Sequence, residues 1–80
     1  MMNRIDLKLI KNGTEEELVL KSCIVDSIMI TSKDVKTPVE EGDFLHHLLP
    51  DGFVEKYLVD EVISNKNEHP HYEIYVSKLN

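Results

Sequence analysis

The four histidines are the residues whose type and spacing first suggest chemistry, and that chemistry would be metal binding. They stand in two close sets, His46-His47 and His69-Pro70-His71. A His-x-His spacing on a strand directs both rings to one face, whereas strand neighbours such as His46 and His47 point to opposite faces. Zinc sites usually add cysteines or carboxylates at set spacings, and this chain has a single cysteine. We therefore expect surface histidines near loops, with no metal and no other cofactor.

The single cysteine, Cys23, is a candidate nucleophile. Nucleophilic catalysis would require a neighbouring base and a lowered thiol pKa. The flanking Ser22 and Ile24 provide neither. A lone cysteine in an apolar stretch is usually part of the core, so we predict a structural role.

Two acidic clusters, Glu15–Glu17 and Glu40–Glu41, could in principle supply paired carboxylates. Glycoside hydrolysis needs one desolvated acid and a substrate cleft, whereas adjacent acids beside turns are usually solvated. The three glycines are isolated from one another, so there is no glycine-rich phosphate loop. We predict no catalytic residues and expect that the protein is not an enzyme.

Composition restricts the partners. The chain of 80 residues has fifteen acids against nine bases, a net charge of −6 and a single arginine, Arg4. Nucleic-acid binding depends on Lys and Arg at phosphates, so nucleic acid is disfavoured and a protein partner with a basic surface is favoured. With 41% hydrophobic and 30% charged residues the chain is typical of a folded protein. Its length predicts one small domain, residues 1–80.

The expected cellular compartment is inferred from the number of cysteines and from the lengths of the apolar segments. One cysteine allows no intramolecular disulfide. Charged residues at positions 4, 6 and 8 interrupt any signal-like segment at the N-terminus. No apolar run approaches the roughly 18 residues of a membrane span. We expect a cytoplasmic protein without membrane contact.

The first third of the chain predicts a hairpin. Ile5, Leu7 and Leu9 alternate with charged residues, as in a half-buried strand. Asn12-Gly13 favours a two-residue type I′ turn. That turn predicts the cross-strand pairs Leu9–Glu16, Leu7–Leu18 and Ile5–Leu20. Asp26-Ser27 then predicts a turn before a strand over residues 28–31, and residues 32–42 read as a loop.

A second hairpin is predicted around Leu49-Pro50-Asp51-Gly52, because proline, aspartate and glycine suit a type I turn followed by a glycine bulge. It joins Asp43–Leu49 to Phe53–Val62. The predicted pairs are Leu49–Phe53, His47–Glu55, Leu45–Tyr57, Leu48–Val54, His46–Lys56 and Phe44–Leu58. Apolar pairs on both faces suggest a coiled ribbon, as in small barrels.

Residues 53–64 also fit a helical stripe that Asp51 could cap, so an α+β fold with a helix there is the alternative. The segment Tyr72–Val76 is rich in β-formers and follows Pro70, which predicts a closing strand. We therefore expect an all-β fold of five or six strands, either a small barrel or a two-layer antiparallel sheet built from hairpins.

The second half of the chain carries turn and core residues in a distinctive order: Pro38-Val39-Glu40-Glu41-Gly42-Asp43, Leu49-Pro50-Asp51-Gly52, Glu55-Lys56-Tyr57-Leu58-Val59 and His71-Tyr72. This order resembles a pattern P-I-E-E-G-D, L-P-N-G, E-x-Y-x-V with a closing H-Y, found in small β domains of bacterial and prophage-encoded proteins without an established function. The resemblance covers Pro38 to Leu79. It implies a strand over Phe53–Val62 and carries no catalytic residue. A looser similarity exists to small β-barrel head-closure and connector proteins of tailed phages.

These observations favour a non-catalytic interaction or structural domain of prophage type. The alternatives are a head-closure or connector-like assembly protein, and a nucleic-acid-binding barrel that stacks bases on Tyr57, Tyr72 and Tyr75. The surface that we expect to meet a partner consists of Glu40, Glu41, Asp43, His47, Glu55 and Tyr57. Reversing the charge of the two glutamates at 40 and 41 should weaken that contact.

Overall fold

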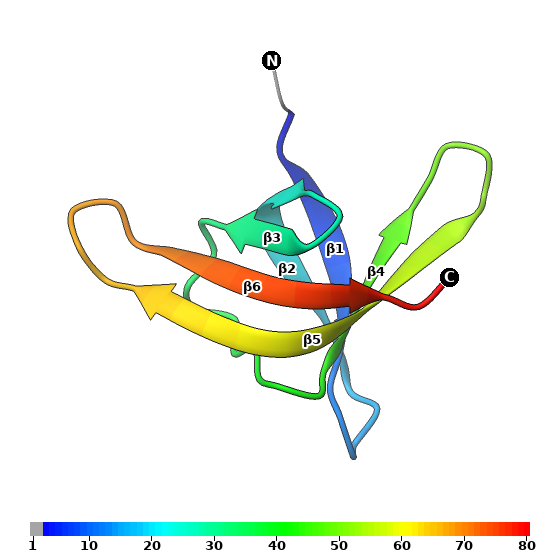
Figure 1. Ribbon diagram of the computed structural model, residues 1–80, viewed down its shortest axis with the longest axis horizontal. Helices are drawn as coiled ribbons and strands as arrows, with labels where there is room; N and C mark the ends of the chain where they lie inside the picture. The colour runs from blue at the N-terminus through cyan, green and yellow to red at the C-terminus, as the bar shows by residue number, and fades with distance from the viewer. Residues whose placement is uncertain (1–2) are drawn as a thin grey trace.

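Period-two alternation of apolar residues builds six strands, and these close into an antiparallel barrel (Figure 1). The computed structural model describes residues 3–80; Met1 and Met2, which the expected domain includes, lie outside the described residues. In chain order the strands are β1 (Ile5–Ile10), β2 (Glu17–Val25), β3 (Met29–Ser32), β4 (Phe44–Leu48), β5 (Val54–Asn65) and β6 (His71–Lys78).

The barrel consists of two three-stranded meanders. Strands β1, β2 and β3 form the first, and β4, β5 and β6 form the second. The meanders meet along two seams, β1 against β4 and β3 against β6, which give the closed order β1-β2-β3-β6-β5-β4. Residues 33–43 are the connection between the meanders.

The alternative of a helix over residues 53–64 is wrong. These residues belong to β5, whose inward side chains Tyr57 and Val59 are buried. β5 pairs with β4 over its first part and with β6 over its second part, so its backbone groups are satisfied by neighbouring strands. The described residues contain no helix of the length and apolarity that crossing a membrane requires.

The first hairpin forms with a longer turn than the two-residue one predicted. The amide of Lys11 donates to the carbonyl of Glu16 at 2.8 Å, and the amide of Glu15 donates to that of Lys11 at 3.0 Å. Leu9 therefore pairs with Leu18 rather than with Glu16, and Leu7 pairs with Leu20. The predicted register would have placed a glutamate opposite a core leucine. Packing two leucines there outweighs the local preference of Asn12-Gly13 for the tighter turn.

A β-bulge follows in the same hairpin. Between the pairs Leu7–Leu20 and Ile5–Cys23 the register shifts, and Ser22 adopts a φ of 57°. The bulge turns β2 so that Cys23 returns to the inner face, where it is fully buried. The predicted core role of Cys23 is confirmed.

The second hairpin is confirmed in register and in turn. All five pairs between Phe44–Leu48 and Val54–Leu58 match the prediction. The amide of Leu49 donates to the carbonyl of Phe53 at 2.8 Å, and Gly52 takes a φ of 92°. The tip of this hairpin projects away from the barrel (Figure 1).

Twelve buried side chains form one core inside the barrel. They are Leu7, Leu9, Leu20, Cys23, Ile30, Val39, Leu45, Tyr57, Val59, Tyr72, Ile74 and Val76. Every strand contributes to this set, and Val39 adds a side chain from the connection between the meanders.

Side-chain hydrogen bonds hold that connection against the barrel. The Asp34 carboxylate accepts from the amides of Lys21, Lys36 and Thr37 and from the Thr37 hydroxyl. The Tyr72 hydroxyl donates to the carbonyls of Val35 and Thr37 at 3.3 and 3.0 Å. The predicted loop over residues 32–42 is therefore ordered, although its first residue, Ser32, ends β3.

Candidate functional site

The surface predicted to meet a partner is divided between the two ends of β4. Asp43 precedes β4 and lies with Glu40 and Glu41 at the base of the second hairpin. His47 and Glu55 pair across β4 and β5 near the hairpin tip. We call these groups the base cluster and the tip cluster, and each has its own geometry.

The base cluster is built around a buried carboxylate. Asp43 is 2% exposed, and its oxygens accept from the amide of Asn12 at 3.0 Å, from the amide of Glu40 at 2.8 Å and from Lys11 Nζ. Lys11 Nζ also donates to the carbonyl of Pro38 at 3.1 Å and to Glu40 Oε1 at 3.2 Å. The cluster thus joins the first turn, the connection and the start of β4.

Opposing effects set the charges of this cluster. Burial alone would raise the pKa of the Asp43 carboxyl, but the hydrogen bonds from Lys11, Asn12 and Glu40 outweigh it and hold that pKa below its ordinary value. Burial likewise opposes the charge of Lys11, yet its bonds to Asp43 and Glu40 raise its pKa. Both groups are charged at neutral pH. Asp43 stabilises the fold and is not accessible to a partner.

The tip cluster is a network around Glu55. Its Oε1 lies 2.9 Å from His47 Nδ1 and accepts from the Tyr57 hydroxyl at 3.2 Å, while Oε2 accepts from Lys78 Nζ at 2.7 Å. The bond from Lys78 is the largest contribution that lowers the pKa of Glu55. The predicted cross-strand pair of His47 and Glu55 is confirmed, and Tyr57 is 3% exposed.

Most of the predicted negative surface is therefore engaged within the chain. Glu40 pairs with Lys11, Asp43 is buried, and Glu55 pairs with Lys78. Glu41 is exposed. Contact between this region and a basic partner stays a prediction, and Glu41 is the carboxylate that can test it with the least effect on the fold.

The outer wall beside the second hairpin carries a different surface, which we call the outer patch. The strand registers align Val19, Lys8, His46 and Lys56 across β2, β1, β4 and β5. Leu48 lies two residues further along β4, and the amide of Leu79 donates to the carbonyl of Lys56 at 2.8 Å. The outer patch comprises Lys8, Val19, His46, Leu48, Lys56 and Leu79.

The outer patch is apolar and cationic. Leu48 is 69% exposed, Val19 is 53% exposed and Leu79 is 52% exposed. Partial burial lowers the pKa of His46, and the neighbouring Lys56 and Lys8 lower it further. Lys8 also pairs with Glu17 at 3.2 Å. Lysines set between exposed aliphatic side chains distinguish this wall within an acidic protein.

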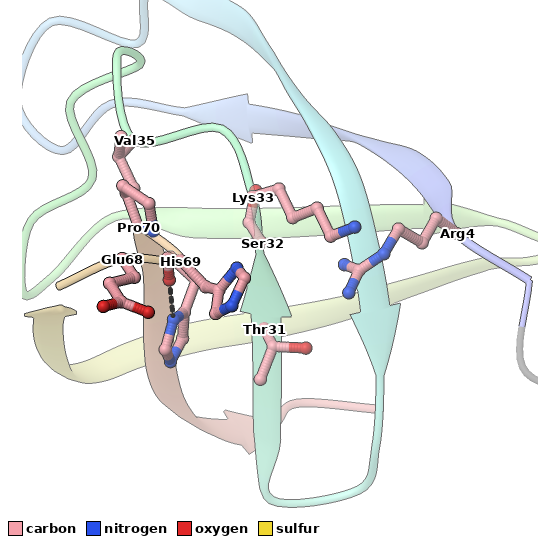
Figure 2. Close-up of a pocket in the computed structure, with 9 residues that line it drawn as sticks. Arg4, Thr31, Ser32, Lys33, Val35, Glu68, His69 and Pro70 are labelled. Atoms are coloured by element: carbon pink, nitrogen blue, oxygen red, sulfur yellow. Dashed lines mark hydrogen bonds between the residues drawn. The ribbon is translucent and has the colours of Figure 1, made fainter. Parts of the chain in front are cut away.

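A groove on another part of the barrel combines cations with histidines (Figure 2). Arg4 and Lys33 line one part of it, while Glu68, His69 and Pro70 contribute from the turn between β5 and β6. His71 Nδ1 donates to the carbonyl of His69 at 2.8 Å, and its Nε2 lies 3.2 Å from Glu73 Oε2. Both partners are hydrogen-bond acceptors, so they favour the protonated ring, and these contacts, the His69 carbonyl first, raise the pKa of His71.

The remaining chemical candidates are placed as follows. Burial raises the pKa of the Cys23 thiol to about 11, so it remains protonated at neutral pH. Among residues 3–80 the structure brings together no group of three or more side chains able to hold a metal ion. Tyr72 is 8% exposed and Tyr57 is 3% exposed, so burial removes both from any base-stacking surface, while Tyr75 is 38% exposed.

Sequence reasoning missed Lys11, although its position carried a signal. Lys11 continues the inward alternation of Leu7 and Leu9, and Asp43 shares the inward alternation of Leu45. Leu9 pairs with Leu45, so the same register places Lys11 opposite Asp43. An acid and a base on inner faces could have been matched once the β1–β4 seam was known, but that seam joins distant parts of the chain and has no local signature.

The chain matches no protein-family model, no curated protein and no solved structure. Its function must therefore be inferred from the surfaces described above.

Proposed function

We propose that this protein is a non-catalytic docking domain that binds another protein through the outer patch. The observation that carries the proposal is the exposure of Leu48 on the projecting second hairpin, on the same wall as the exposed Val19 and Leu79. Covering such exposed aliphatic side chains with a partner removes apolar surface from water, which stabilises the complex by about 25 cal/mol per Å².

The charges of the outer patch favour an acidic partner surface. Lys8 and Lys56 lie on either side of His46 on the wall, so the two lysines would attract an approaching carboxylate-rich surface although the chain as a whole is acidic. Long lysine side chains also cover apolar surface with their methylenes while the ammonium stays hydrated. This differs from the basic partner expected from net charge alone.

Comparison of two matched variants tests the docking proposal. Leu48→Asp introduces a carboxylate into the outer patch, and Ile28→Asp introduces one at a residue of nearly equal exposure, 67% against 69%, outside the patch. Neither residue belongs to the buried core. We expect a protein partner captured by the wild type to bind Ile28→Asp equally well. Its affinity for Leu48→Asp should be lower by a factor of roughly ten or more.

Binding with the purified partner then separates the alternatives. Under the proposal, Lys56→Glu slows association and reduces its salt dependence, whereas Glu41→Lys has little effect. Equal binding by the wild type and Leu48→Asp would remove the outer patch as the docking surface. Weakening by Glu41→Lys alone would instead favour the contact predicted at the base cluster.

A further inference from the structure

The groove in Figure 2 has the size of a small-molecule site. Its volume is about 670 Å³, within the roughly 300–1,000 Å³ usual for such sites. It lies between residues leading into β1, the end of β3 and the turn between β5 and β6. It does not share a residue with the outer patch.

The bulge in β2 brings two cations to this groove. Ser22, in its left-handed conformation, presents one carbonyl that accepts from Arg4 Nη1 at 2.8 Å and from the backbone amide of Lys33 at 3.3 Å. Arg4 directly precedes β1 and Lys33 directly follows β3, and their charged ends converge in Figure 2. The bulge therefore holds the guanidinium of Arg4 and the backbone of Lys33, from which the Lys33 side chain extends into the groove.

These two cations lack carboxylate partners among the described residues, although acids outnumber bases by fifteen to nine in the chain. Every ion pair found within residues 3–80 uses another base: Lys8, Lys11, His47, His71 or Lys78.

The carboxylates near this end of the barrel have other bonds or lie apart. Asp6 accepts from the amide of Ser22 at 3.3 Å, and Asp34 accepts from the amide of Lys21 at 3.2 Å. Glu68 lines the groove on the side away from Arg4 and Lys33 in Figure 2. Two like charges held together repel each other, and a bound anion removes that repulsion.

We propose that the groove binds the phosphate group of a small molecule, held by Arg4, Lys33 and the hydroxyl of Thr31. The planar guanidinium of Arg4 suits two phosphate oxygens, and the ammonium of Lys33 supplies the second positive charge for a dianion. The Thr31 side chain lies on the same side of the groove in Figure 2, and its hydroxyl makes no hydrogen bond within the described part of the chain. Val35 and Pro70 offer apolar walls for the remainder of an organic phosphate.

Titrations followed by amide NMR spectra test this site with two probes, inorganic phosphate and glycerol 3-phosphate, each against chloride at equal ionic strength. We expect saturable shifts at the amides of Arg4, Thr31 and Lys33 with both phosphates and not with chloride. Tighter binding of glycerol 3-phosphate identifies an organic phosphate as the ligand, and equal or tighter binding of inorganic phosphate identifies the free ion. Both results support the site.

Matched variants separate specific binding from general charge. Each of Arg4→Gln and Lys33→Gln should weaken binding roughly tenfold, because each removes a charge-assisted contact. Lys36→Gln combined with Lys66→Gln removes two exposed charges outside the groove and should leave the affinity unchanged. Thr31→Val keeps every charge and should weaken binding by a smaller factor.

Two results would overturn the phosphate site. One is amide shifts that never saturate with phosphate; the other is an equal loss of phosphate affinity in the groove variants and in the control. Thermal melting of each variant checks that the barrel remains folded. The outcome is independent of the docking proposal, since Leu48→Asp leaves every groove residue in place.

Discussion

Replacing Lys11 by methionine should destabilise the barrel strongly, because it leaves the buried Asp43 carboxylate without its cation. Asp43 is 2% exposed, and the Lys11 side chain is 12% exposed. Removing one member of a buried ion pair costs about 3–5 kcal/mol. Two backbone amides continue to donate to Asp43 in the variant, so we expect the lower end, about 3 kcal/mol.

Urea denaturation followed by circular dichroism measures this loss. With a slope of about 1 kcal/mol/M for a small domain, the midpoint should fall by about 3 M. Lys8→Met is the matched control, since Lys8 lies in β1, the strand that ends directly before Lys11, and its pair with Glu17 is exposed, at 56% and 60%. An exposed pair contributes about 0–1 kcal/mol.

The pH dependence gives an independent check. Since the pKa of Asp43 is lowered in the folded state, its stabilisation is present above the unfolded value of about 3.9 and is lost as pH falls through the folded value. The pKa of Lys11 is raised, so its contribution is present below about 10.4 and is lost as pH rises through the folded value.

The difference between wild type and Lys11→Met should therefore be largest between about pH 5 and pH 9 and should narrow at both extremes. A midpoint within about 0.5 M of the wild type at pH 7, or a difference that stays constant below pH 4, would refute this account of the base cluster.

Three further measurements test other parts of the fold. Gly42→Ala and Gly52→Ala should each cost about 1–2 kcal/mol of stability in urea denaturation, because both glycines have positive φ, 91° and 92°; the Asn12 side-chain amide, which would lie 2.8 Å from a Cβ at Gly42, can move aside, and an unchanged midpoint in either variant would contradict the strain. Cys23 should resist a thiol reagent at pH 8 in the folded protein and react on unfolding, because burial raises its pKa to about 11; rapid labelling of the native state would contradict that burial. Tyr72→Phe should lower the free energy of unfolding by about 1 kcal/mol through loss of the hydroxyl bonds to the connection, and an unchanged denaturation midpoint would show that those bonds contribute nothing.

The second hairpin could be predicted from sequence because its determinants are local. Pro50, Asp51 and Gly52 specify the turn, and the turn fixes the register of every pair in the ribbon. The first hairpin was harder, since Asn12-Gly13 specifies one register and the core another. Where the two disagreed, burial of Leu18 beside Leu9 decided the outcome.

The surfaces could be predicted less well than the strands. Sequence identifies Glu40 and Glu55 as charged, but it does not show that Lys11 and Lys78 neutralise them across long-range contacts. The groove depends on the bulge at Ser22, and a serine with positive φ has no distinctive local pattern. The composition of these candidate surfaces therefore depends on which strands the barrel closure brings together.

Because the barrel consists of two meanders, the connection between them, residues 33–43, decides whether the chain closes as a monomer or exchanges meanders in a dimer. Both seams could equally form between the first meander of one chain and the second meander of another, so an exchanged dimer would contain the same strand pairs as the monomer. The difference between the two forms then lies in the connection, which must extend for exchange to occur. Within the connection the amides of Lys36 and Thr37 donate to Asp34, and these bonds keep the segment turned rather than extended, which favours the chain that closes on itself.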